Sequence, residues 1–168
     1  VTDPSNVTYR HILLVEPVGK NTLPAISWAM QRIRQQSGSA TAVVFPSDHI
    51  LDTEAAAQIR AAEPLAQDHL VTFGIKPDCP HTGYGYIRPG NPLPPGFAVE
   101  EFKEKPDEKT AAGYVQKGYL WNSGIFLLSV PCFFAELGRY RPALAAVFRG
   151  DSAPDSPSRR SAGRRSTA

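Results

Sequence analysis

The chain has 168 residues, of which 42% are apolar and 20% are charged, a composition ordinary for a globular protein with one buried core. The net charge of +2 is uneven, because residues 149–168 hold five arginines and two aspartates, a net +3, which leaves −1 for residues 1–148. This nearly neutral body gives little electrostatic support to nucleic-acid binding. No apolar run approaches the ~20 residues of a membrane span. Cys79 and Cys132 show no metal-ligand or redox spacing, so free thiols in a reducing cytoplasm are expected.

The first predicted elements are a strand and a helix. Residues 11–15, His-Ile-Leu-Leu-Val, form a short apolar strand candidate. A helix should follow, with Asn21 or Thr22 capping its start and Gly38 marking its end. Its apolar side chains recur at helical spacing, at Ile26, Met30 and Ile33.

The next elements alternate in the same way. Residues 42–45 are a buried-type strand closed by a proline, and residues 70–75 are another uninterrupted apolar strand. Between them Asp52 or Thr53 can cap a second helix, which runs to about residue 62. Strands that are apolar on both faces and alternate with helices indicate a parallel α/β sheet.

From residue 76 the pattern changes to shorter strands. We predict these over 83–88, 97–102 and 124–130. A proline-rich loop is expected at 89–95, a helix near 108–117 ended by Gly118, and a last helix over 131–140. Residues 149–168 lack large apolar side chains and are predicted to be a disordered Ser/Arg-rich tail. The chain thus divides into one domain, 1–148, and this tail.

Asp48 is the strongest single candidate for function. It lies just past the carboxyl end of the strand at 42–45, where ligands of open α/β sheets bind. Its carboxylate is the hard oxygen ligand that the Mg²⁺ of a nucleotide complex needs. The alternative is an aspartate that caps the following turn.

Polar groups follow other apolar stretches. The glycines of Thr-Gly-Tyr-Gly-Tyr-Ile at 82–87 allow close approach of a ligand, or mark a twisted edge strand. Glu104 and Lys105 combine a hydroxyl acceptor with a phosphate-binding cation, or form an exposed charge pair. Asn122 suits adjacent sugar hydroxyls, or is a turn residue. Each signal is weak alone.

Together and in order, these motifs resemble bacterial mannose-1-phosphate guanylyltransferases over roughly residues 9–148. The motifs that carry the resemblance are Glu-Pro-Val-Gly-Lys-Asn-Thr at 16–22, Phe-Pro-Ser-Asp-His at 45–49, Thr-Gly-Tyr-Gly-Tyr-Ile at 82–87, Glu-Lys-Pro-Asp at 104–107 and Trp-Asn-Ser-Gly at 121–124. Their order and spacing are those of the family.

The resemblance implies a Rossmann-like nucleotidyltransferase fold, with a mixed, mostly parallel sheet flanked by helices. It implies a cytoplasmic enzyme that joins GTP and mannose 1-phosphate, with Mg²⁺, to give GDP-mannose and pyrophosphate. The residues that would lie near the guanine and ribose are Glu16, Asn21 and Thr22. Asp48 would hold the metal. The residues that would surround the sugar and its phosphate are Gly85, Glu104, Lys105 and Asn122, with Asp48 and Lys105 as the catalytic groups.

The chain also departs from the family pattern. Members open with a glycine-rich loop that contains arginine and a following lysine, and nothing before Val15 matches it. The expected second metal-binding aspartate is not matched downstream either. We therefore expect a fragment with an incomplete fold and little activity alone. The oligomeric state is left open, with a homo-oligomer as one alternative. The alternatives are a non-catalytic module that binds sugar phosphate or nucleotide, and an RNA-binding role for the arginine-rich tail.

Overall fold

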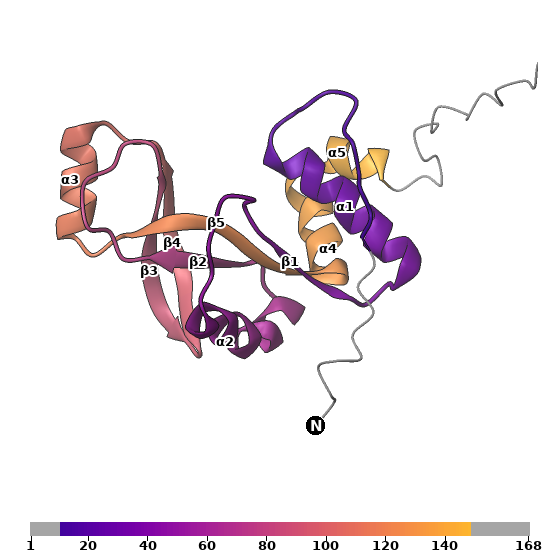
Figure 1. Ribbon diagram of the computed structural model, residues 1–168, viewed down its shortest axis with the longest axis horizontal. Helices are drawn as coiled ribbons and strands as arrows, with labels where there is room; N and C mark the ends of the chain where they lie inside the picture. The colour runs from indigo at the N-terminus through magenta and orange to yellow at the C-terminus, as the bar shows by residue number, and fades with distance from the viewer. Residues whose placement is uncertain (1–10, 149–168) are drawn as a thin grey trace, which may run out of the picture.

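The computed structural model describes residues 11–148, which form an open five-stranded sheet flanked by helices (Figure 1). The strands are β1 (Thr41–Val44), β2 (Val71–Ile75), β3 (Gly85–Leu93), β4 (Gly96–Glu104) and β5 (Leu120–Ser129). The helices are α1 (Thr22–Gln36), α2 (Thr53–Ala61), the 3₁₀ helix η2 (Glu63–Gln67), α3 (Glu108–Gln116), α4 (Val130–Tyr140) and α5 (Pro142–Val147). The predicted α/β class, a sheet flanked by helices, is confirmed. The predicted tail at 149–168 lies outside the described residues.

β5 is the central strand of this sheet. Leu127 pairs with Val43 of β1 and with Val71 of β2, so β1 and β2 occupy its two edges. Nearer its start, Trp121 pairs with Tyr86 of β3, on the edge opposite β2. β4 completes the sheet as the hairpin partner of β3.

The predicted strand directions are wrong, because every pairing among the described strands is antiparallel. β1 and β2 do run in the same direction, but β5 lies between them and runs the opposite way. Helices cover both faces of β5, and a strand buried on both faces is an uninterrupted apolar run whichever way its neighbours run. The apolar pattern therefore predicts burial but not direction.

Two apolar clusters hold the helices on this sheet. On one face Leu128 packs with Met30 of α1 and Phe133 of α4. On the other face Leu127 packs with Ile59 of α2 and Ala66 of η2. Figure 1 shows α1, α4 and α5 gathered at one end and α2 beneath the middle of the sheet.

A third cluster anchors the hairpin end of the molecule. Tyr86 and Tyr119 are buried with Ala111 of α3, and the Tyr86 hydroxyl donates to the carbonyl oxygen of His81 at 2.9 Å. α3 begins at the cap Asp107, whose side chain accepts from the Thr110 amide at 2.8 Å. This packing fixes β3 and β4 beside the start of β5.

The helix predictions are confirmed, and so are several predicted capping residues. Asn21 caps α1 and Asp52 caps α2, and Gly118 follows the end of α3. α1 ends at Gln36, just before the predicted stop at Gly38. Both cysteines are free thiols, as expected. None of the helices within the described residues has the length and apolar character that crossing a membrane requires.

Two local predictions fail. Residues 11–15 form no strand, and Leu13 and Val15 are 87% and 69% exposed, because no neighbouring strand within 11–148 pairs with them. The proline-rich segment 89–95 is a turn only at residues 94–95, since β3 continues through Pro89 and Pro92 to Leu93 and β4 begins at Gly96. β3 pairs with β5 only at Tyr86 and Ile87, so the prolines lie beyond that ladder.

Candidate functional site

Gly85, Glu104 and Asn122 lie together on one face of the sheet. Gly85 and Glu104 are paired across the β3–β4 hairpin. A side-chain carbon added to Gly85 would lie 2.9 Å from Oε2 of Glu104, 3.2 Å from Cζ of Phe102 and 3.4 Å from Cβ of Asn122. The absence of a side chain at Gly85 therefore lets Glu104 and Phe102 pack closely against this backbone, beside Asn122.

Lys105 follows directly after β4 and completes this group. Its backbone N–H donates to the carbonyl oxygen of Tyr84 at 3.2 Å, and its φ of 43° is left-handed, which is uncommon outside glycine. Strained backbone of this kind occurs often at functional sites. Its Nζ lies 4.0 Å from Oε1 of Glu104, with both side chains more than half exposed. Such a pair is weak, so the ammonium group can turn to a ligand phosphate.

Asn122 is held by contacts that the sequence did not reveal. Its Oδ1 accepts from the Thr72 hydroxyl at 2.9 Å and from the Gly124 amide at 3.3 Å. Thr72 was missed as a site residue, and the only signal was a single hydroxyl within the apolar run at 70–75. The half-buried amide of Asn122 is thus fixed from behind.

The loop that carries Asp48 meets the same region through Pro46. Gly124 has a φ of +74°, and a side chain there would lie 3.2 Å from Cγ of Pro46. Asp48 is exposed in the turn that follows, and its side chain forms no hydrogen bond within residues 11–148. The turn-capping alternative is therefore not seen for Asp48, and Asp52 performs the nearest cap.

Metal binding by Asp48 stays a prediction. Among the described residues no group of three or more His, Cys, Asp or Glu side chains could enclose a metal ion. Mg²⁺ in nucleotide sites is commonly held by one or two carboxylates together with substrate phosphates. Asp48, exposed and unbonded at the end of β1, is consistent with that arrangement.

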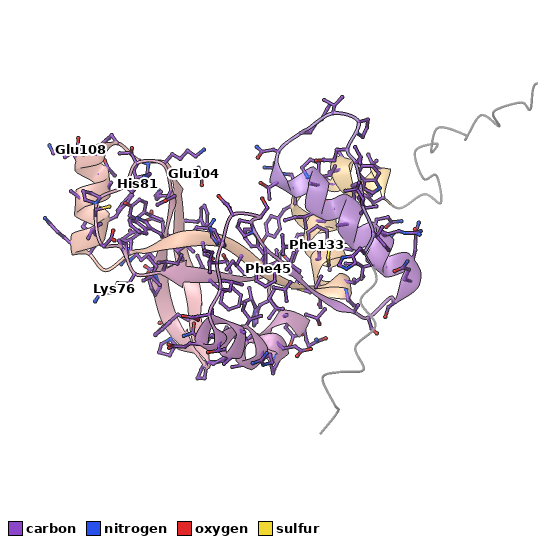
Figure 2. The ribbon with its side chains drawn as sticks, viewed as in Figure 1. Phe45, Lys76, His81, Glu104, Glu108 and Phe133 are labelled. Carbon is purple, nitrogen blue, oxygen red and sulfur yellow. The ribbon has the colours of Figure 1, made fainter. Side chains whose placement is uncertain are left out.

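Glu16, Asn21 and Thr22 lie apart from this group, at the start of α1. Asn21 Oδ1 accepts from the Thr22 amide at 3.0 Å. Within the described residues, no side-chain hydrogen bond or ion pair joins them to Glu104, Asn122 or Asp48. In Figure 2, Phe45 lies between the part that carries Glu104 and the part that carries Phe133 and α1. Glu104 and helix α1 thus lie on either side of Phe45 in this view, and the roles of Glu16, Asn21 and Thr22 stay predictions.

Aromatic side chains support the site from the opposite face of the strands. Trp121 and Tyr86 are the neighbours of Asn122 and Gly85, so they point the other way. Tyr84 packs edge-on against Trp121, with ring centroids 5.1 Å apart, and stacks on His81 at 4.1 Å. This packing limits the motion of the strands that carry the site.

An apolar hollow lies outside this group of residues. It has a volume of about 640 Å³ and lies between the helical segment of Ala62 and Leu65 and the hairpin tip of Leu93 and Phe97. Its lining is mainly apolar and contains Thr72, but not the predicted sugar-phosphate residues. The polar side chains of Glu104, Lys105 and Asn122, beside Gly85, lie outside this apolar lining, and we take them as the candidate site.

Comparison with known proteins finds a family and relatives that match most of the chain. The sequence pattern of the family described as nucleotidyl transferase matches residues 2–153. The xanthan biosynthesis protein XanB of Xanthomonas campestris strain B100 is 47% identical over 137 residues, which is 79% of this chain and 29% of that protein. The mannose-1-phosphate guanylyltransferase of Escherichia coli K12 is 43% identical over 142 residues, covering 77% of this chain and 30% of that enzyme.

A solved structure agrees as well. The crystal structure of mannose-1-phosphate geranyltransferase from Thermus thermophilus superimposes with a TM-score of 0.70 at 33% identity. The match covers 83% of this chain and 43% of that one. The chain thus spans under a third of the length of the curated relatives described above. By its sequence pattern and its relatives, this chain belongs to the nucleotidyl transferase family.

Proposed function

We propose that the chain functions in sugar-phosphate nucleotidyl transfer. In this reaction GMP is transferred from GTP to mannose 1-phosphate, giving GDP-mannose and pyrophosphate. The observation that carries the proposal is that Glu104, Lys105 and Asn122 lie together beside Gly85. A relative with 43% identity that is named for mannose 1-phosphate supports this choice of sugar.

The site groups suit the parts of a sugar phosphate. The Glu104 carboxylate would accept hydrogen bonds from sugar hydroxyls, and the Asn122 amide would add a second polar contact. Lys105 would neutralise the phosphate, as an ammonium group beside phosphate oxygens does. Held in this way, a phosphate oxygen attacks the α-phosphorus of GTP, a new P–O bond forms, and the bond to pyrophosphate breaks. The contribution of these side chains is orientation and charge stabilisation.

Asp48 is the residue that would hold the Mg²⁺ of the nucleotide, with the phosphates as the other ligands. When bound, the ion supplies positive charge that stabilises the phosphate oxygens. Glu16, Asn21 and Thr22 would contact the guanine and ribose across the Phe45 loop. All four assignments are part of the proposal.

The test is a calorimetric titration of the purified chain with mannose 1-phosphate and, separately, with GTP–Mg²⁺. We expect saturable binding of mannose 1-phosphate that Lys105→Ala weakens by about 1.5–3 kcal/mol, the usual size of a hydrogen bond to a charged group. Lys117→Ala is the matched control, because Lys117 is an exposed lysine at the far end of α3. Equal affinity of the Lys105→Ala variant and the unaltered chain would contradict the proposal.

A further inference from the structure

The hydrogen bonds around Asn122 define which end of its amide faces outward. Two donors converge on Oδ1, the hydroxyl of Thr72 on β2 at 2.9 Å and the backbone N–H of Gly124 at 3.3 Å. Turning the amide over would place its N–H₂ group against the Gly124 N–H, donor against donor. The oxygen therefore faces inward and the N–H₂ group faces outward.

Thr72 is the part of this arrangement that comes from another strand. Its hydroxyl has one proton and two acceptors within reach, Oδ1 of Asn122 at 2.9 Å and the carbonyl oxygen of Ile125 at 3.2 Å. The Asn122 contact is the shorter one and therefore takes the proton. The Gly124 contact alone is long for an N–H···O bond, so without Thr72 the amide would be poorly held.

The N–H₂ group of Asn122 is the end of the amide that remains available to a ligand at the candidate sugar-phosphate site. Within residues 11–148 it has no hydrogen-bond partner, in contrast to Oδ1. The position that a Gly85 side chain would take is 3.4 Å from Cβ of Asn122 and 2.9 Å from Oε2 of Glu104. A side chain with a free donor and a side chain with an acceptor thus both lie beside Gly85.

We propose that Thr72 is a positioning residue that holds Asn122 with its N–H₂ group toward the ligand, so that the site offers a donor beside the Glu104 acceptor. This arrangement selects a ligand with two neighbouring oxygen groups: a hydroxyl that donates to Glu104 and an oxygen that accepts from Asn122. Vicinal hydroxyls meet this requirement, and so does a hydroxyl beside a phosphate ester. The inference rests on the proposed function for the choice of ligand, but not for the orientation of Asn122.

The variants separate positioning from a structural role. Thr72→Val keeps the branched shape that suits a strand and removes only the hydroxyl, whereas Thr72→Ser keeps the hydroxyl. Thr41→Val is the matched control, since Thr41 is also a strand threonine, in β1, with a long 3.4 Å contact to Gln67. Asn122→Asp keeps the acceptor toward Thr72 and Gly124 but replaces the outward donor with an acceptor.

The first measurement is calorimetric affinity for mannose 1-phosphate. Thr72→Val should weaken binding by about tenfold, the loss of roughly one hydrogen bond, and Thr72→Ser should restore it. Asn122→Asp should weaken binding more than Thr72→Val, and Thr41→Val should leave it unchanged. Thr72→Val binding as well as the unaltered chain, or Thr72→Ser binding as poorly as Thr72→Val, would overturn the inference.

The second measurement needs no ligand and separates failure of this inference from failure of the proposed function. In the free chain, the ¹³C resonance of the Asn122 side-chain carbonyl reports the hydrogen bonds that it accepts. It should move upfield in Thr72→Val and stay in place in Thr72→Ser and Thr41→Val. If the unaltered chain binds no mannose 1-phosphate and this shift is still seen, the substrate is wrong and the positioning stands. An unmoved resonance in Thr72→Val overturns the positioning.

Discussion

At the scale of single residues, the site depends as much on an absent side chain as on those present. Gly85 is buried among the carboxylate of Glu104, the ring of Phe102 and the side chain of Asn122. Glu104 and Phe102 are both partly exposed, so their side chains can move if a side chain is added at Gly85. A change at Gly85 should therefore affect ligand binding more than folding.

Gly85→Ala should weaken mannose 1-phosphate binding by about tenfold, on the order of one hydrogen bond, because the new methyl group displaces the Glu104 carboxylate. The melting temperature should change little. Gly113→Ala is a matched control with the opposite expectation: its position in α3 is open, so alanine should stabilise the fold by ~0.5–1 kcal/mol and leave binding intact. If Gly85→Ala binds mannose 1-phosphate as well as the unaltered chain, the ligand does not bind beside Gly85.

Asp48→Asn should reduce Mg²⁺-dependent binding of GTP and leave the circular dichroism spectrum unchanged, because the Asp48 carboxylate has no partner within the described residues. Calorimetry with and without Mg²⁺ measures the effect. Asp52→Asn is the control, since Asn also caps helices well and α2 should persist. Loss of fold in Asp48→Asn would point to a structural role that the structure does not show.

At the scale of elements, the sequence predicts what depends on local chemistry. Cap residues such as Asp52 and Asp107 act on backbone N–H groups three positions away, so the sequence alone identifies the starts of α2 and α3. The direction of β5 depends on partners far along the chain, and the apolar pattern contains no information on it. The same holds for Thr72, whose role arises from a contact with Asn122, fifty positions away.

The hairpin of β3 and β4 is tied to β5 by a titratable contact. The Tyr119 hydroxyl donates to Oε2 of Glu101 at 2.5 Å, and Nζ of Lys103 lies 3.0 Å from its other oxygen. The Tyr119 hydrogen bond, with that of Lys103, lowers the pKa of Glu101 below its usual 4.5. A lowered carboxyl pKa contributes stability that is present above 4.5 and is lost as the pH falls through the lowered value.

Tyr119→Phe should therefore lower the melting temperature at pH 7, and the difference from the unaltered chain should narrow as the pH falls below about 4.5. Thermal unfolding followed by circular dichroism between neutral and acidic pH measures this. Tyr140→Phe, at an exposed tyrosine of α4, should show no such difference. A melting-temperature difference that stays constant with pH would mean that the charge on Glu101 contributes no stability.

At the scale of the whole molecule, an unpaired strand edge bears on behaviour in solution. β1 lies at the end of the sheet and pairs only with β5 within residues 11–148. Val43 and, just after it, Phe45 are 38% and 46% exposed. An open edge with apolar side chains favours association between chains.

We expect concentration-dependent self-association, measured by sedimentation velocity. Val43→Lys should suppress it, because a charge on an edge strand opposes pairing. Val147→Lys, at an exposed valine of α5, should not. A purified chain that stays monomeric at high concentration would contradict the expectation.

The central claim is that Gly85, Glu104, Lys105 and Asn122 form a sugar-phosphate site. The most direct measurement is a ¹H–¹⁵N NMR titration of the chain with mannose 1-phosphate, with mannose and inorganic phosphate as separate controls. The account predicts backbone shifts concentrated at 84–85, 104–105 and 122–124, larger for the sugar phosphate than for either part. Absence of shifts there, or shifts confined to the apolar hollow around Leu65, Leu93 and Phe97, would contradict it.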